Sequence, residues 1–346
     1  MEKMVINKLK KIIEQYQKYT FANATKNLIY HWQTREKRKT FGALNPDKVF
    51  YVIRSIDDKN RFYIGPQNHL LANYFYVLSH LRYAQINGWI PIIDMLNYPV
   101  YNSLPYPVNG TANAWEYFWQ QPSQYTLEEV YQSKNVILSK QNWYKQYDMG
   151  YEILNYLDKS TINFYWQIAQ AVQLNDITKA FINCEKEKIW RVNSEKDKIL
   201  GICFRFGGHS LRHYNYGQGH PIQPDEDYII KIAREKIKKY GINKIFIASD
   251  TNEAIEIFKN EFGDRLIFVD RIRYSEKIKN VSENPLYRIN QILKTSKYYL
   301  LEMELLAICD FLIGSINSGF RYAVVKNNNN YKDIEILNCG FLPDKR

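Results

Sequence analysis

The chain has 346 residues, of which 45% are hydrophobic, so it holds enough apolar material for a sizeable core and is not a disordered protein. Its formal net charge is +11, but +7 of that charge lies within residues 1–44, and the rest of the chain carries only +4. Because the basic excess is confined to one segment and no nucleic-acid-binding motif is present, we expect no nucleic acid partner.

Residues 1–44 are predicted to form a basic amphipathic helical arm. Apolar side chains recur there at helical spacing with lysines between them: Val5, Leu9, Ile12, Ile13 and Tyr16. Such a helix either packs on the body of the protein or on a second subunit, or makes a peripheral contact with an anionic membrane. We find no signal-peptide core and no apolar run of about 20 residues, so we expect a cytoplasmic protein, which the membrane contact would hold at the inner face of the plasma membrane.

Residues 45–185 are predicted to form a first Rossmann-like domain. Its expected strands cover residues 48–54, 89–94 and 135–139. A loop at Gly65–Asn68 is followed by a helix, since Leu71, Tyr74, Leu78 and Leu81 recur at helical spacing. A loop-rich stretch at 95–125, a short capped helix at 126–133 and a mainly helical segment at 147–184 complete this part.

Residues 186–346 are predicted to form a second Rossmann-like domain. Short apolar strands are expected at 198–204, 244–249, 266–269, 310–314 and 333–338. Helices are expected between them, at 225–240 and 252–261, up to about 309, and from about 318. Strands that alternate with helices in this way indicate a parallel sheet covered on both faces. The predicted class is therefore α/β, with two Rossmann-like domains that face each other.

Polar residues follow three strands of this second half at the ends where they would meet. Arg205 follows the strand at 198–204, Asp250 follows the next strand, and the turn Ser315–Gly319 follows the strand at 310–314. Ligands of doubly wound sheets bind at the carboxyl ends of the strands. A guanidinium group can bind a diphosphate through two hydrogen bonds, and a Ser/Gly turn at a helix start offers backbone N–H groups to an anion. The set therefore suits a nucleotide and its phosphates.

Each of these residues also has a simpler interpretation. Asp250 could cap the following helix, and Arg205 could be an ordinary salt-bridge partner. Ser315–Gly319 could be only a helix start, and His220, which precedes Pro221, could be a loop histidine bonded to backbone. All of them except His220 are placed directly after a strand end of one predicted sheet, and this common position favours a binding site.

Several motifs of other enzyme classes are missing from the sequence. There is no GxxxxGK[ST], GxGxxG or GxSxG, which excludes P-loop chemistry and the α/β-hydrolase class and leaves a dinucleotide fold unsupported. No acidic pair is placed to hold a metal-bound diphosphate, and the four cysteines show no metal-ligand spacing. We therefore expect no cofactor and no metal site, with positive side chains and helix N-termini neutralising the diphosphate.

Three stretches of the second half carry a family resemblance: GICFRFGG…GHPIQP, IFIASDTNEAIEIFKNEFGDRLIFVDRIR and LLEMELLAICDFLIGSINSGF. Together they resemble the GDP-fucose-dependent fucosyltransferases, in particular the core α1,6-fucosyltransferases and the nodulation-type enzymes. In the first half, IGPQNHLLANYFYVLSHLRYAQINGWIPIID and NAWEYFW…YTLEEVYQSKNVIL are similar to bacterial surface-polysaccharide relatives. The resemblance covers roughly residues 48–340, through the order and spacing of these stretches.

The resemblance implies a GT-B fold, in which residues 45–185 form the acceptor-side domain and residues 186–346 the donor-binding domain, with a central cleft between them. It implies an inverting, metal-independent transfer of fucose from GDP-fucose to a glycan or lipid-linked glycan acceptor. Arg205 matches the arginine that grips the donor diphosphate. The predicted donor-binding residues are Arg205, His220, Asp250, Glu302, Ser315, Asn317 and Ser318. On the acceptor side, Asn68 matches a loop element that faces the cleft.

The sequence departs from the family at the loop after Arg205. The family motif is close to His-x-Arg-Arg-x-Asp, or Arg-Gly-Thr-Asp in bacterial relatives, whereas residues 203–208 read CFRFGG. No carboxylate lies between Arg205 and His220, where the core enzyme has its proposed base. The candidate bases are therefore His213, from the histidines of this loop, and Asp94 on the other domain. Arg205 is the third residue expected to take part in catalysis.

The aromatic stretch at 113–119, with Trp115 and Glu116, is expected to shape the acceptor side, because aromatic faces stack on sugar rings. Two alternatives follow from the departures at 203–208. The chain could be a nucleotide-sugar-binding protein without catalysis, or a GT-B transferase that uses a different sugar nucleotide.

Overall fold

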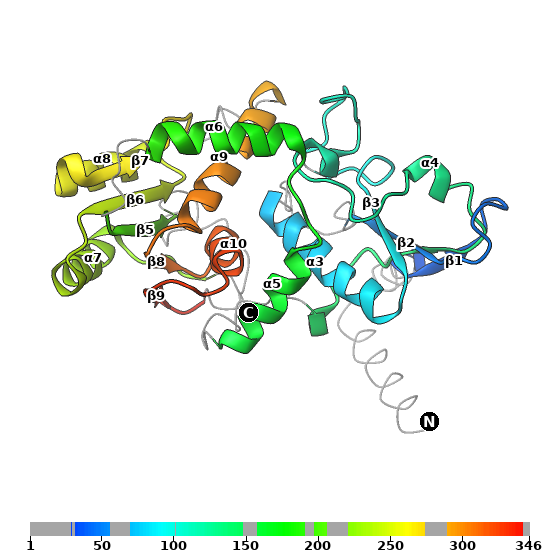
Figure 1. Ribbon diagram of the computed structural model, residues 1–346, viewed down its shortest axis with the longest axis horizontal. Coiled ribbons are helices and arrows are strands. Elements are labelled where there is room, and N and C mark those ends of the chain that lie inside the picture. Colours follow the sequence, from blue (N-terminus) through cyan, green and yellow to red (C-terminus); the bar gives the residue numbers. More distant parts are fainter. Residues whose placement is uncertain are drawn as a thin grey trace, which may run out of the picture.

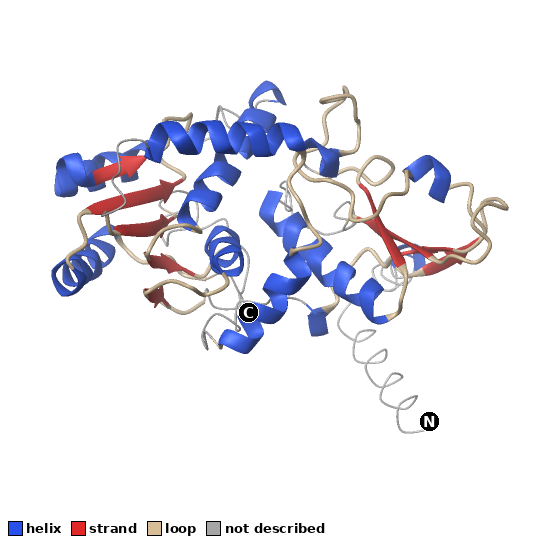
Figure 2. Cartoon of the chain, viewed as in Figure 1, coloured by secondary structure: helices blue, strands red, loops and turns tan. Residues whose placement is uncertain are grey.

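The computed structural model describes residues 29, 32–55, 70–100, 102–147, 158–190, 197–205, 221–273 and 289–341. Over these ranges the chain forms two β-sheets, each packed against helices (Figure 1, Figure 2). One sheet belongs to the first half of the sequence and the other to the second half. The predicted α/β class is confirmed.

The sheet of the second half has five parallel strands in the order β7-β6-β5-β8-β9. Its strands are β5 (Ile199–Phe204), β6 (Lys244–Ser249), β7 (Leu266–Phe268), β8 (Phe311–Ser315) and β9 (Asp333–Leu337). The helices that alternate with them are α7 (Glu226–Tyr240), α8 (Asn252–Phe262), α9 (Ile289–Leu306) and α10 (Ser318–Asn327). This is the alternation of strands and helices that the sequence predicts.

The strands of this sheet are buried on both faces because their side chains point alternately to opposite sides. On one face, Leu200 and Ile202 of β5 pack with apolar residues of α7 and α8. On the other face, Cys203 of β5 and Leu312 of β8 belong to a larger core that includes α9 and α10. A helix layer on each face explains why these strands read as continuous apolar runs.

The sheet of the first half has four strands in the order β1-β4-β2-β3. These are β1 (Lys37–Lys39), β2 (Phe50–Arg54), β3 (Ile90–Asp94) and β4 (Val136–Leu138), and only β1 is antiparallel. Helix α3 (Leu70–Ile86) covers one face and the short helix α4 (Leu127–Val130) the other. The segment ends with a 3-10 turn (Lys145–Tyr147), followed by α5 (Lys159–Ala169) and α6 (Asp176–Trp190).

Strand β1 corrects the predicted extent of the N-terminal arm. Residues 37–39 lie in the sheet rather than in a helix, and the preceding backbone is tied to the body by a 2.7 Å bond from the Gln141 N–H to the Thr34 carbonyl. Strand β4 offers an open edge that this segment fills, and the basic side chains of β1 discourage pairing with further chains. Residues 1–28 of the arm lie outside the described residues.

Helix α6 bridges the two halves. It packs on α9, and Trp190 at its end contacts Phe246 of β6 with ring centroids 5.6 Å apart. The predicted domain boundary between residues 185 and 186 therefore falls inside a helix that lies against the second sheet.

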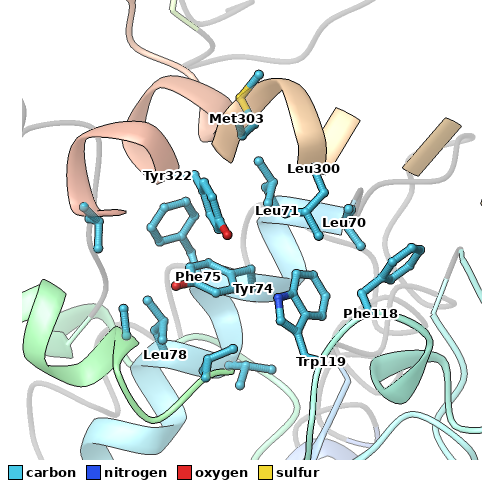
Figure 3. Packing of buried hydrophobic residues seen from close by; sticks show 14 of the residues in the cluster. Leu70, Leu71, Tyr74, Phe75, Leu78, Phe118, Trp119, Leu300, Met303 and Tyr322 are labelled. Carbon is cyan, nitrogen blue, oxygen red and sulfur yellow. The ribbon is translucent and has the colours of Figure 1, made fainter. Parts of the chain in front are cut away.

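The two halves share a hydrophobic core where α3 meets α9 and α10 (Figure 3). Tyr74 of α3 and Tyr322 of α10 meet edge to face at 5.0 Å between ring centroids, and the Arg321 guanidinium lies 4.6 Å from the Phe75 ring. Near the same contact, the Asn102 amide donates a 3.2 Å hydrogen bond to the Ser296 hydroxyl. The halves are therefore packed together here, and the cleft predicted between them would have to lie beside this contact.

Candidate functional site

The candidate site lies at the carboxyl edge of the second sheet, at the point where the strand order reverses direction. From β5 the chain proceeds to β6 and β7 on one side, and then crosses to β8 and β9 on the other. In open α/β sheets this switch point between β5 and β8 is where ligands bind. Arg205 follows β5 at this point, and the turn Ser315–Gly319 leaves β8 toward α10. The structure thus brings together two of the predicted donor-binding elements.

Arg205 and Asp250 face each other across neighbouring strand ends. The Arg205 Nε and Asp250 Oδ2 atoms are 3.8 Å apart, and the two side chains are 36% and 30% exposed. Such a long, partly exposed ion pair contributes little to stability. Among the described residues Arg205 has no closer ionic partner, and a guanidinium group carries five N–H donors with which it could bind a ligand.

The simpler interpretation of Asp250 as a helix cap is wrong. The cap of α8 is Thr251, whose hydroxyl accepts a hydrogen bond of 3.2 Å from the Ala254 N–H. Asp250 therefore lies one residue before the cap, at the strand end, where its carboxylate is 30% exposed toward the site.

The turn between β8 and α10 is held by its own side chains. Asn317 caps α10 by accepting from the Phe320 N–H at 2.9 Å, and its amide donates to the Ser315 carbonyl at 3.1 Å. The Ser315 hydroxyl donates to the side-chain oxygen of Gln223. The predicted residues Ser315 and Asn317 are thus occupied in shaping the turn.

The N-terminus of α10 presents backbone donors instead. No described residue accepts a hydrogen bond from the Ser318 or Gly319 N–H, and the helix dipole makes this end favourable for an anion. Gly314 lets the helix approach the strand closely, because a Cβ there would lie 2.5 Å from the Phe320 ring. The turn can therefore bind phosphate through its backbone.

Glu302 is buried and fully paired. Its carboxylate accepts hydrogen bonds from Arg271 at 2.7 Å and from Arg273 at 2.9 Å, and all three side chains are at most 5% exposed. Both arginines also donate to the Ser249 carbonyl, at 2.9 and 3.3 Å. Burial among like charges lowers the pKa of Arg273, and the nearby Glu302 opposes this shift. Glu302 can therefore serve the site by holding the strand end before Asp250, rather than by touching a ligand.

Asp94, a predicted base, is buried, and its carboxylate is fully hydrogen-bonded. It has no exposed surface, and its carboxylate accepts four hydrogen bonds: from the Leu96 and Asn97 N–H groups at 3.1 and 2.8 Å, from the Asn97 amide at 2.9 Å and from the Tyr131 hydroxyl at 2.6 Å. Every lone pair that could take a proton is engaged. The geometry gives Asp94 the role of fixing the turn after β3, and it does not support Asp94 as the base.

Of the predicted acceptor-side residues, Trp115 is internal and Glu116 is half-buried. Trp115 has no exposed surface, stacks on Trp119 at 4.5 Å and donates from its indole N–H to the Gln120 carbonyl at 3.0 Å. Glu116 accepts from Thr111 and Gln121 side chains, both at 2.7 Å. The expectation that this aromatic stretch stacks on a sugar is wrong for Trp115, because its ring is covered by the core that joins the halves.

Three predicted site residues, Asn68, His213 and His220, lie outside the described residues. Within the described ranges, no group of three or more His, Cys, Asp or Glu side chains is placed to hold a metal ion, and no helix is long and apolar enough to cross a membrane.

Sequence reasoning missed three contributors to this edge: Gln223, Arg273 and Tyr299. Gln223 anchors Ser315 from 92 positions away in the chain, which no local pattern reveals. Arg273 follows Arg271 by two residues, and that spacing after a strand was the available signal. Tyr299 precedes Glu302 by three residues on α9, which places both on one side of the helix, and this helical spacing could have indicated it.

No family model and no curated protein matches the chain. Among solved structures, it is similar to the NodZ α1,6-fucosyltransferase soaked with GDP-fucose, at 12% identity and a TM-score of 0.44, over 86% of this chain and 99% of that one. It is also similar to NodZ from Bradyrhizobium (14% identity, TM-score 0.42, 80% and 92% covered) and to POFUT1 in complex with GDP (10% identity, TM-score 0.36, 85% and 76% covered). The solved structures to which the chain is similar thus include the nodulation-type α1,6-fucosyltransferase. The chemistry of the site carries the functional proposal.

Proposed function

We propose that the chain is an inverting, metal-independent glycosyltransferase of the GT-B type. It moves fucose from GDP-fucose to a glycan or lipid-linked glycan acceptor during bacterial surface-polysaccharide biosynthesis. The observation that carries the proposal is that Arg205 and the N-terminus of α10 follow two neighbouring strands, β5 and β8, at the switch point of the second sheet. A guanidinium group and aligned backbone N–H groups are what a leaving diphosphate requires.

In the proposed reaction an acceptor hydroxyl attacks the anomeric carbon from the face opposite the diphosphate. The bond from that carbon to the phosphate oxygen breaks, and GDP leaves with the electron pair. Arg205 and the Ser318 and Gly319 N–H groups stabilise the negative charge that develops on the diphosphate. Asp250, one strand away, is placed to accept hydrogen bonds from the nucleoside and to orient Arg205.

The proton of the acceptor hydroxyl needs a base. Because Asp94 is closed off by four hydrogen bonds, the proposal relies on His213. Histidine is the side chain type whose reference pKa suits proton transfer near neutral pH. The same closure of Asp94 favours the second candidate function, a nucleotide-sugar-binding protein without catalysis. The two candidate functions differ in whether the protein converts the bound donor to products.

The N-terminal segment is proposed to hold the protein at the inner face of the plasma membrane. Its basic character complements anionic lipid headgroups. A chain that lacks residues 1–28 keeps β1 and should lose association with anionic liposomes; unchanged co-sedimentation would rule out this role.

The test of the proposed function is a panel of sugar nucleotides in a thermal-shift assay, followed by a hydrolysis and transfer assay. GDP-fucose and GDP should stabilise the wild type, and Arg205→Ala should abolish the shift. Arg234→Ala is the matched control, because Arg234 is bonded to Glu261 on the exposed outer surface of α7 and α8.

Three outcomes decide between the candidates. Stabilisation by a UDP- or CMP-sugar, with no effect of GDP compounds, would reject fucose as the donor sugar. Stabilisation by GDP-fucose without hydrolysis or transfer to any acceptor would favour the binding protein. No response to any nucleotide would reject both.

A further inference from the structure

Tyr299 on α9 points its hydroxyl at the N-terminus of α10. The hydroxyl oxygen lies 2.8 Å from the position that a Cβ on Gly319 would occupy, and the Met303 sulfur lies 2.6 Å from the same position. Only glycine leaves room for a phenol group at this point of the helix. The Tyr299 hydroxyl is thus in contact with the first turn of α10, whose Gly319 N–H has no acceptor among the described residues.

The surroundings of this hydroxyl are mainly apolar, with charged groups of both signs nearby. Burial raises the pKa of Tyr299 well above its ordinary value, Arg205 and Arg271 lower it, and Cys203 and Glu302 raise it further. The phenol therefore stays protonated at neutral pH, and it can act as a hydrogen-bond donor but not as a base.

Tyr298, the neighbour of Tyr299, lies on a different side of α9. Its ring packs edge to face on Phe181 at 5.3 Å, where α9 meets α6.

The Tyr299 hydroxyl has no hydrogen-bond partner within the described part of the chain. Of the acceptors described nearby, the Asn317 side chain and the Glu302 carboxylate are already bonded, whereas Arg205 and the Gly319 N–H are donors. The Tyr299 hydroxyl therefore needs an acceptor. An anionic ligand would satisfy the whole group at once.

We propose that the Tyr299 hydroxyl donates a hydrogen bond to the diphosphate of the nucleotide, next to Arg205 and the N–H groups of Ser318 and Gly319. The inference rests on the proposed function and deepens it, because it assigns a third kind of donor to the leaving group. Arg205 supplies charge, the helix supplies backbone N–H groups, and Tyr299 supplies a neutral donor that adds no further positive charge. A phosphate oxygen bound by all three would be held from three elements, β5, α9 and α10.

The test compares Tyr299→Phe with Tyr298→Phe in the full-length chain, by calorimetric titration with GDP and with GMP. Phenylalanine keeps the ring and removes only the hydroxyl. A hydrogen bond to a charged group corresponds to about a tenfold or greater change in affinity. Tyr299→Phe should therefore weaken GDP binding about tenfold and GMP binding clearly less, if the hydroxyl contacts the phosphate that GMP lacks. Tyr298→Phe should match the wild type with both ligands.

The outcomes separate this inference from the proposed function. If Arg205→Ala abolishes GDP binding while Tyr299→Phe binds GDP as the wild type does, the function stands and the inference is overturned. If Tyr299→Phe weakens GDP and GMP equally and lowers the thermal midpoint without ligand, its role is structural and the inference is again overturned. If the wild type binds no nucleotide, both fail.

Discussion

The carboxyl edges of the two sheets differ in how far their polar groups are satisfied. At the end of β3 in the first half, the Asp94 carboxylate accepts four hydrogen bonds and has no exposed surface. At the end of β5 in the second half, the polar contact that the described residues give Arg205 is the 3.8 Å approach of Asp250, and Arg205 is about one-third exposed. A charged residue at a strand end is therefore a poor guide to function by itself, and the number of its partners separates a structural group from one available to a ligand.

The polar groups at the carboxyl edge of the second sheet lie above a closed cluster, a set of three buried side chains that pair with one another. Glu302, Arg271 and Arg273 pair in the interior and hold the Ser249 carbonyl, which leads to Asp250. In the first half, one of the interior polar groups is His80, which is bonded to Tyr51 at 2.8 Å and to the Asn142 carbonyl at 3.1 Å. Since the carbonyl can only accept, Nε2 of His80 carries the proton, and Nδ1 accepts from the tyrosine.

The largest expected effect comes from breaking the closed cluster of the second half. Glu302→Gln leaves two buried arginines without a counter-charge and should lower the free energy of unfolding by about 3–5 kcal/mol. The control Glu261→Gln removes an exposed partner of Arg234 and should cost less than about 1 kcal/mol. Chemical denaturation of both variants checks this, and equal losses in the free energy of unfolding would show that the closed cluster does not stabilise this edge of the sheet.

The next effect concerns the interior of the first half and appears as pH dependence. Burial lowers the pKa of His80 to about 3, while in the unfolded chain a histidine titrates near its ordinary value of about 6.5. Between these values the unfolded state binds a proton that the folded state does not, so stability falls as the pH falls below about 6.5. From this residue alone the loss is about 2 kcal/mol between pH 6.5 and pH 5.

His80→Gln is the variant that isolates this contribution, because glutamine can accept from Tyr51 and donate to the Asn142 carbonyl without titrating. Its free energy of unfolding should change less with pH than that of the wild type over the same window. Parallel pH profiles would mean that His80 is protonated in the fold or is not buried.

The smallest expected effect is on donor binding and turnover, and it tests the closed edge directly. Asp94→Asn replaces one acceptor oxygen with an NH2 group, and at the Oδ2 position that group faces both the Tyr131 hydroxyl and the Asn97 amide. Stability should fall by about 1–3 kcal/mol while donor affinity and turnover stay within about twofold of the wild type. A large loss of turnover at unchanged stability would restore Asp94 as a base and remove the difference between the two edges.

The sequence predicts the second sheet well because its strands are apolar runs buried on both faces. The prediction of 198–204 and the observed β5 (Ile199–Phe204) differ by one residue. Strand β1 was missed because Lys37–Lys39 is an exposed edge strand, where neither alternation nor apolar character is required.

The site was predicted less completely than the fold, because side-chain availability depends on distant partners. Asp94 is closed by Tyr131, 37 residues away, and Trp115 is covered by the core shared between the halves. The placement of Arg205 and of the turn after β8 at this edge could be predicted because it follows from strand ends alone. Tyr299 was missed because its role depends on the contact between α9 and α10.

The most direct test of the central claim is hydrogen exchange of the full-length chain with and without GDP-fucose, read by mass spectrometry. The claim is that the carboxyl edge of the second sheet holds the donor and that of the first sheet does not. Peptides that cover Cys203–Arg205 and Ser315–Phe320 should exchange more slowly when the donor is bound, while the peptide that covers Asp94–Asn97 should be unchanged. Protection at Asp94–Asn97 with none at Ser315–Phe320 would contradict it.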